Sequence, residues 1–126
     1  MQHKALFILL LVVRPFCGFA QKAYETEQYT GKLNGRTIQL ALANGYIGTS
    51  KISLFNTDKG KPVLFIPDMG TADDQSRLTF HSTQKLWQGY FMLNNIQDVY
   101  EQLPAYINGK YYLNKKIIAV KFRLVK

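Results

Sequence analysis

The chain has 126 residues, of which 47% are hydrophobic and 19% are charged, and its formal net charge at pH 7 is +8. This composition is typical of one globular domain and excludes a collagen-like, coiled-coil or disordered chain. The basic residues are scattered rather than gathered in a run, which favours solvated surface charge over a nucleic-acid interface. We therefore expect no nucleic-acid partner, whereas attraction to anionic envelope polymers stays open.

The first twenty residues have the organisation of a secretory signal peptide. Lys4 supplies a positive start, the nine residues from Ala5 to Val13 are all apolar, and small side chains stand at positions 18 and 20. The apolar run is about half the roughly 20 residues that a membrane span requires, so a retained anchor is the weaker interpretation. We expect cleavage after Ala20, a secreted domain of residues 21–126, and a periplasmic or extracellular location.

The only cysteine, Cys17, lies inside this N-terminal segment. Lipid attachment to Cys17 is disfavoured, because a lipidated cysteine follows small residues and here Pro15 and Phe16 precede it. The domain of residues 21–126 then has no thiol, so its stability has to come from its core and its sheet rather than from disulfides. It also keeps a net positive charge and has no segment that could cross a membrane.

Turn signals at intervals of about ten residues predict an antiparallel meander. Asn34-Gly35 and Asn44-Gly45 are the clearest, since Asn and Gly accept the positive backbone angles of two-residue hairpin turns. Between the turns, apolar and polar residues alternate as they do in strands that bury one face. The predicted strands are 28–33, 36–43, 46–55, 63–66, 77–82, 86–93, 106–113 and 117–125.

One segment has a helical rather than an alternating period. Asn95 is placed as an N-cap and Pro104 ends the run, so a short helix is predicted before the last two strands. The apolar positions spaced i, i+3, i+4 and i+7 are Ile96, Val99, Tyr100 and Leu103. About eight strands with hairpin-length links predict an all-β single domain curled into a small up-and-down barrel. The pattern leaves open whether the sheet closes, whether its interior is packed, and what the oligomeric state is.

Turn glycines and strand aromatics recur in four stretches, Tyr29–Ile38, Gly45–Thr49, Asn108–Tyr112 and Val120–Leu124. In these stretches the chain resembles small secreted bacterial β-meander proteins of unknown function. The resemblance implies a curled antiparallel fold and an exported location, and it carries no catalytic residues. Gly45–Thr49 also resembles the opening hairpins of avidin-type and lipocalin-type barrels, but a shared barrel shape does not determine a ligand.

The residues that commonly perform catalysis do not form a recognisable constellation. The one histidine of the secreted domain, His81, alternates onto the polar face of its strand. Ser82 and Lys85 have a Ser–Lys spacing but stand at a strand end rather than on a helix. Asp98 and Glu101 lie three residues apart on the predicted helix, without an opposing wall that would make a cleft. We therefore predict no catalytic residues and a protein that is not an enzyme.

Three carboxylates, Asp68, Asp73 and Asp74, share one loop with Gly70. Carboxylate oxygens are ligands for calcium, but the regular spacing of a calcium-binding loop is missing, and acidic loop residues are usually solvated turn formers. A single histidine and no cysteine disfavour zinc. The sequence therefore predicts no metal site and no cofactor.

The remaining candidate is an aromatic surface on the predicted strand 106–113. Tyr106, Lys110 and Tyr112 alternate onto one face, and Trp87 extends this row if the neighbouring strand pairs in register. Flat rings with hydrogen-bonding tips suit stacking on sugars or capturing a peptide, although tyrosine is favoured in strands for structural reasons as well. We therefore predict Trp87, Tyr106, Lys110 and Tyr112 as ligand-binding residues of an exported, non-enzymatic module for a glycan, envelope polymer, peptide or protein.

Two alternatives to this binding module remain. Surface loops on a rigid scaffold often carry function, so the loop of residues 67–76 raises the hypothesis of a secreted inhibitor that blocks an enzyme. The other alternative is a hydrolase of unrecognised type, whose carboxylates would be gathered from several loops.

Overall fold

The structure is a computed structural model that describes residues 25–55 and 60–126. The predicted signal peptide of residues 1–20 lies outside this part of the chain. The strands are β1 (Thr26–Leu33), β2 (Arg36–Ala43), β3 (Lys51–Leu54), β4 (Val63–Pro67), β5 (Leu78–Ser82), β6 (Tyr90–Leu93), β7 (Tyr106–Leu113) and β8 (Lys116–Leu124). A 3-10 turn, η1 (Ile47–Thr49), precedes β3. In the described ranges, no helix combines the length and the apolar character that crossing a membrane requires.

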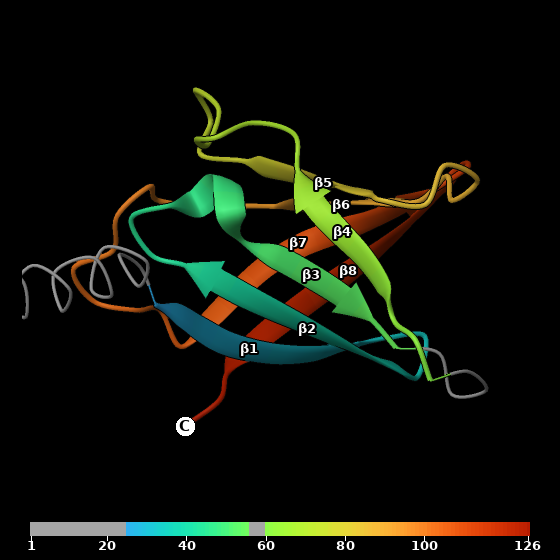
Figure 1. Cartoon of the computed structure of the whole chain (residues 1–126), viewed down its shortest axis with the longest axis horizontal. Coiled ribbons are helices and arrows are strands. Elements are labelled where there is room, and N and C mark those ends of the chain that lie inside the picture. Colours follow the sequence, from blue (N-terminus) through green and yellow to red (C-terminus); the bar gives the residue numbers. More distant parts are fainter. Residues whose placement is uncertain (1–24, 56–59) are drawn as a thin grey trace, which may run out of the picture.

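Each strand pairs antiparallel with its neighbour in the chain, and β1 pairs with β8, so the sheet closes into a barrel (Figure 1). The predicted all-β, up-and-down barrel is confirmed. The closing seam is short, with Tyr29 opposite Leu124 and Thr30 opposite Arg123. Beside this seam, a Cβ atom on Gly31 would collide with the carbonyl oxygen of Lys121. A glycine at this position therefore lets the two strands approach closely enough to pair.

Alternating side chains fill the centre of the barrel. Ile38, Leu40 and Leu42 of β2 are buried, as their spacing predicts. The largest aromatic side chains with 0% exposure are Tyr29, Phe65, Phe80, Phe91 and Phe122. Phe65 and Phe91 pack edge to face, with ring centroids 4.9 Å apart. The barrel is therefore a packed core, and ligand recognition has to be sought on its outer wall or at its ends.

The two Asn-Gly pairs behave differently. Asn34 and Gly35 have φ values of 50° and 79°, as the predicted two-residue turn between β1 and β2 requires. At the second pair only Gly45 has a positive φ, and the chain continues through η1 before β3 begins at Lys51. The predicted tight hairpin and the strand start at 46 are wrong here, because the Asn44 side chain bonds to the distant residue Tyr100 instead of shaping a turn.

Residues 94–105 do not form the predicted helix. The backbone N–H of Ile96 donates to the carbonyl of Ser76 at 2.7 Å, and that of Tyr100 donates to Asn44 Oδ1 at 2.7 Å. Neither N–H therefore donates to the carbonyl four residues earlier, as it would in an α-helix. Asn95, expected as an N-cap, has a left-handed φ of 55°. The helical spacing of Ile96 and Tyr100 instead reflects two side chains that the segment buries against the core.

The barrel has two distinct ends. The connections 44–50, 68–77 and 94–105 meet at the η1 end, where Gly45 N–H donates to the carbonyl of Asp98 and Ala72 N–H donates to Asp98 Oδ1. The β1–β2, β5–β6 and β7–β8 connections, the end of β3 and the start of β4 lie at the opposite end, which we call the hairpin end (Figure 1). The predicted strand 86–93 begins only at Tyr90, and Leu86, which is 96% exposed, belongs to the β5–β6 connection.

Candidate functional site

The structure places Tyr106, Lys110 and Tyr112 on the outer face of β7, while Ile107 and Tyr111 point into the core. Six residues of extended strand separate the two outer tyrosines by about 20 Å. They therefore lie in different surroundings and cannot contact one small ligand together.

Tyr112 belongs to an aromatic ladder across three strands. It lies opposite Tyr90 of β6, which in turn lies opposite His81 of β5. The rings of Tyr112 and Tyr90 stack with centroids 4.9 Å apart and an interplanar angle of 12°, and His81 lies 5.1 Å from Tyr90. Tyr90 therefore covers one ring face of Tyr112. Such cross-strand pairs stabilise a sheet by about 0.2–1 kcal/mol each, which accounts for the ladder without a ligand.

His81 ends this ladder on the open surface. Its Nδ1 atom lies 2.5 Å from Oδ1 of Asp68, the residue that follows β4, and both side chains are exposed. An exposed pair of this kind contributes little to stability because water and salt screen it. The position agrees with the outward orientation predicted for His81.

Trp87 lies away from the β7 row, at the hairpin end. Its Nε1–H donates to Tyr111 Oη at 2.9 Å, and its ring meets Phe65 edge to face at 6.3 Å. Because β6 starts at Tyr90, Trp87 has no register position beside β7. The structure therefore does not bring Trp87 together with Tyr106, Lys110 and Tyr112.

Tyr106 lies in a basic groove on the wall formed by β7, β8 and β1. The ring is 49% exposed, and Lys121 Nζ lies 4.7 Å from its centroid. Arg123 lies opposite Tyr106 on one side and opposite Thr30 on the other. Two depressions of about 330 and 780 Å³ share Thr30, Tyr106 and Arg123, and we call them together the β7–β8–β1 groove.

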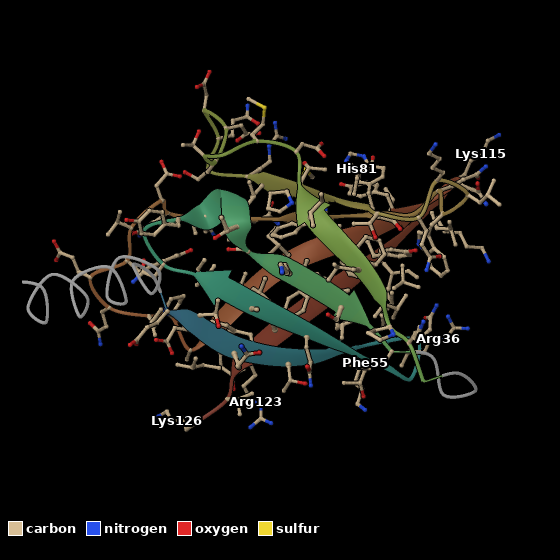
Figure 2. The ribbon with its side chains drawn as sticks, in the orientation of Figure 1. Arg36, Phe55, His81, Lys115, Arg123 and Lys126 are labelled. Atoms are coloured by element: carbon tan, nitrogen blue, oxygen red, sulfur yellow. The ribbon has the colours of Figure 1, made fainter. Side chains whose placement is uncertain are left out.

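The β7–β8–β1 groove is lined by cations. They are Lys32, Lys121, Arg123 and Lys126, and no acidic side chain is among the described residues that line either depression. Arg123 and Lys126 project from the outside of the barrel near the C-terminus (Figure 2). Lys110 extends this positive surface, since Asn108 pairs with Lys121 and Lys110 follows two positions later on the same face.

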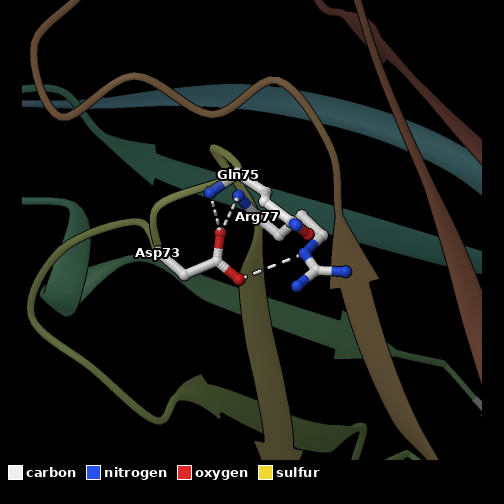
Figure 3. Close-up of polar contacts among 3 residues, drawn as sticks. All are labelled: Asp73, Gln75 and Arg77. Atoms are coloured by element: carbon white, nitrogen blue, oxygen red, sulfur yellow. Dashed lines mark hydrogen bonds and ion pairs between the residues drawn. The ribbon is translucent and has the colours of Figure 1, made fainter.

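The loop after β4 is shaped by Asp73 (Figure 3). Oδ1 of Asp73 accepts hydrogen bonds from the backbone N–H groups of Gln75 and Arg77 at 2.9 and 2.8 Å, and Oδ2 accepts one from Arg77 Nε at 3.1 Å. The backbone N–H of Arg77 is the main reason why the pKa of Asp73 lies below its usual value; the Gln75 N–H and the Arg77 side chain add to this, and burial opposes it. Met69 in the same loop is 66% exposed. Inhibition of an enzyme through residues 67–76 stays a prediction.

Four of the other candidate residues, besides His81, have local structural partners: Asp68, Asp73, Ser82 and Asp98. Asp68 pairs with His81 and Asp73 with Arg77, and within residues 25–55 and 60–126 no group of three or more metal-ligating side chains comes together. Ser82 Oγ accepts a hydrogen bond from the Gln84 N–H at 2.9 Å, as in a turn. Asp98 Oδ1 accepts the N–H of Ala72, which ties two connections at the η1 end.

Sequence reasoning missed Lys32, Lys121 and Arg123 as site residues. Alternation places Lys121 and Arg123 outward on the last strand, but only closure of the barrel brings β1 beside β8. Comparisons with protein-family models, with curated proteins and with solved structures found no match to this chain. The function therefore has to be argued from the chemistry of the groove itself.

Proposed function

We propose that this chain is an exported, non-enzymatic binding module that holds an anionic polymer, such as an acidic envelope glycan, in the β7–β8–β1 groove. The observation that supports this most directly is the set of cations around an exposed tyrosine, without an acidic neighbour among the described lining residues. The packed core also favours recognition on the surface. The proposal of export rests on the N-terminal sequence.

The groove residues have complementary roles in this proposal. The planar guanidinium of Arg123 matches the geometry of a carboxylate, sulfate or phosphate group, and the lysines supply point charges beside it. Tyr106 offers part of a ring to the apolar face of a sugar, with Lys121 next to it. Each exposed contact is weak, but a polymer presents many equivalent acidic groups, so several contacts form together.

Neutralising the groove tests the proposal. We expect Arg123→Gln and Lys121→Gln each to weaken binding of a soluble polyuronate by about two- to fivefold at low salt, since each removes one exposed charge contact. The double variant should weaken it further. Tyr106→Ala should also reduce affinity, whereas Tyr112→Ala should change it little, because its ring faces Tyr90. Fluorescence anisotropy of the labelled polymer measures these affinities.

Lys51→Gln is the matched control, because Lys51 is an exposed lysine of β3 that does not line the groove. It removes the same charge from the molecule and should leave polymer binding nearly unchanged. A neutral dextran serves as the second ligand. The proposal fails if the polyuronate does not bind, if dextran binds equally well, or if Lys51→Gln weakens binding as much as Arg123→Gln does.

A further inference from the structure

A second cavity lies at the hairpin end of the barrel, away from the β7–β8–β1 groove. Its volume is about 270 Å³. It is lined by Leu33, Asn34, Arg36, Leu54, Trp87, Tyr111 and Leu113. Leu33, Leu54 and Tyr111 are buried and form its floor, so the cavity reaches the core rather than resting on the outer wall. The described lining residues are mainly apolar, and one of them is charged.

Two polar groups of this cavity, the Trp87 indole and the Tyr111 hydroxyl, hold each other in place. Trp87 Nε1–H donates to Tyr111 Oη, and Gly89 lies so close to this hydroxyl that any Cβ atom there would overlap it. Tyr111 Oη accepts from Trp87 and can donate its own proton to a ligand. Burial raises the pKa of Tyr111, while the hydrogen bond from Trp87 and the nearby charge of Arg36 oppose that shift. The tyrosine is therefore a neutral donor at pH 7.

Arg36 is the one cation among the described residues that line the cavity, and no hydrogen bond or ion pair joins its side chain to another of them. Figure 2 shows Arg36 near Phe55 at this end of the molecule. The other cations of the hairpin end are Lys32, Lys61, Lys85, Lys115 and Lys116, and the described residues of this end include no acid. These described cations attract anions toward the cavity.

We propose that the cavity at the hairpin end binds a small carboxylate with a short hydrocarbon tail. The carboxylate pairs with the Arg36 guanidinium and accepts a hydrogen bond from the Tyr111 hydroxyl, and the tail contacts Leu54 and Leu113. The volume lies just below the roughly 300–1,000 Å³ of sites for drug-sized ligands, which favours a short tail. This site is independent of polymer binding, because the two cavities share no lining residue.

Titration with straight-chain carboxylates from butanoate to octanoate tests this site. Trp87 is the only tryptophan of the chain, so its fluorescence reports on the cavity directly. We expect affinity to rise by about fourfold for each methylene until the cavity is full. The matching alcohols should bind about tenfold more weakly or worse, because they lack the charge that pairs with Arg36.

Three variants locate the site. Arg36→Gln should weaken carboxylate binding by about tenfold while leaving alcohol binding unchanged, and Leu113→Glu should abolish carboxylate binding by placing a like charge at the cavity. Lys85→Gln is the matched control, since it removes a cation from the same end without touching the lining. Circular dichroism melting confirms that each variant is folded.

Methyl chemical shifts of Leu54 and Leu113 give a second readout beside fluorescence, and carboxylate-induced shifts confined to the cavity would support the site. The proposal is overturned if neither readout responds to octanoate. Equal affinity for acids and alcohols would overturn it as well. The proposal is also overturned if Lys85→Gln loses as much carboxylate affinity as Arg36→Gln does.

Discussion

Tyr29 links the core to the segment that crosses the η1 end. Its ring is fully buried, and its hydroxyl donates to the carbonyl of Pro104 at 2.7 Å. Burial raises the pKa of Tyr29 to about 12, with smaller contributions from Tyr100 and Glu27. Because the pKa is higher in the folded than in the unfolded chain, the stability from neutral Tyr29 is complete below pH 10. It is lost as the pH rises from about 10 to 12.

Tyr29→Phe should lower the free energy of unfolding at pH 7 by about 1 kcal/mol, because the carbonyl of Pro104 loses its donor. The same variant should lose less stability than the parent protein between pH 10 and 12, since Phe does not ionise. Urea denaturation at a series of pH values measures both effects. Tyr106→Phe is the control, as this tyrosine is half exposed. If the free energy of unfolding of Tyr29→Phe fell between pH 10 and 12 as steeply as that of the parent protein, ionisation of Tyr29 would not be the cause of the loss.

At the scale of elements, Asn44 connects the end of β2 to residues 94–105. Its Nδ2 donates to the carbonyl of Tyr100 at 2.9 Å, and its Oδ1 accepts the Tyr100 N–H at 2.7 Å. One side-chain amide thus satisfies both backbone groups of a residue 56 positions away. Ser50 acts similarly nearby, since its Oγ accepts the N–H of Ala43 at 2.9 Å. These side chains bond to backbone groups in place of the regular hydrogen bonds between strands, which stop where the sheet ends.

Asn44→Ala should lower the free energy of unfolding by about 1–3 kcal/mol, because two partly buried backbone groups of Tyr100 lose their partner. Hydrogen exchange of the Tyr100 amide should become faster, while amides in the centre of β2 keep their protection. Asn108→Ala, at an exposed position of β7, provides the comparison. If the Tyr100 amide stayed protected in Asn44→Ala, the proposed role of Asn44 would be incorrect.

At the scale of the whole molecule, charge is separated along the barrel axis. The acidic residues that the structure describes all lie toward the η1 end: Glu25, Glu27, Asp68, Asp73, Asp74, Asp98 and Glu101. Cations dominate the hairpin end, where Figure 2 shows Arg36 and Lys115. Loops that join even-numbered to odd-numbered strands share one end in an up-and-down barrel, so scattered sequence positions produce this polarity.

The cations that line the β7–β8–β1 groove predict a strong salt dependence for polymer binding. Raising sodium chloride from about 0.1 to 1 M shortens the screening length from about 10 to 3 Å, so polyuronate affinity should fall by at least about tenfold. Carboxylate binding in the cavity near Arg36 should fall less, because its tail contacts are apolar. Parallel titrations at the two salt concentrations measure both. A polyuronate affinity that does not depend on salt would contradict electrostatic binding in the groove.

Elements that depend on neighbouring residues alone could be predicted from the sequence. Alternation placed β2 at 36–43 and β7 at 106–113 with the observed bounds, and Asn34-Gly35 predicted its turn, because pleating and positive φ values depend on neighbouring residues. The same alternation correctly placed Tyr106 and Lys110 on the outer wall.

Features that depend on residues distant in the chain could not be predicted from the sequence and are seen only in the folded barrel. Residues 94–105 have a helical period, yet they bond to Ser76 and Asn44 and cover a barrel end. Trp87 turns inward and donates a hydrogen bond to Tyr111. The groove lies where β1 pairs with β8, two strands from opposite ends of the domain's sequence. Barrel closure pairs strands from opposite ends of the chain, and no local pattern records which side chains then become neighbours.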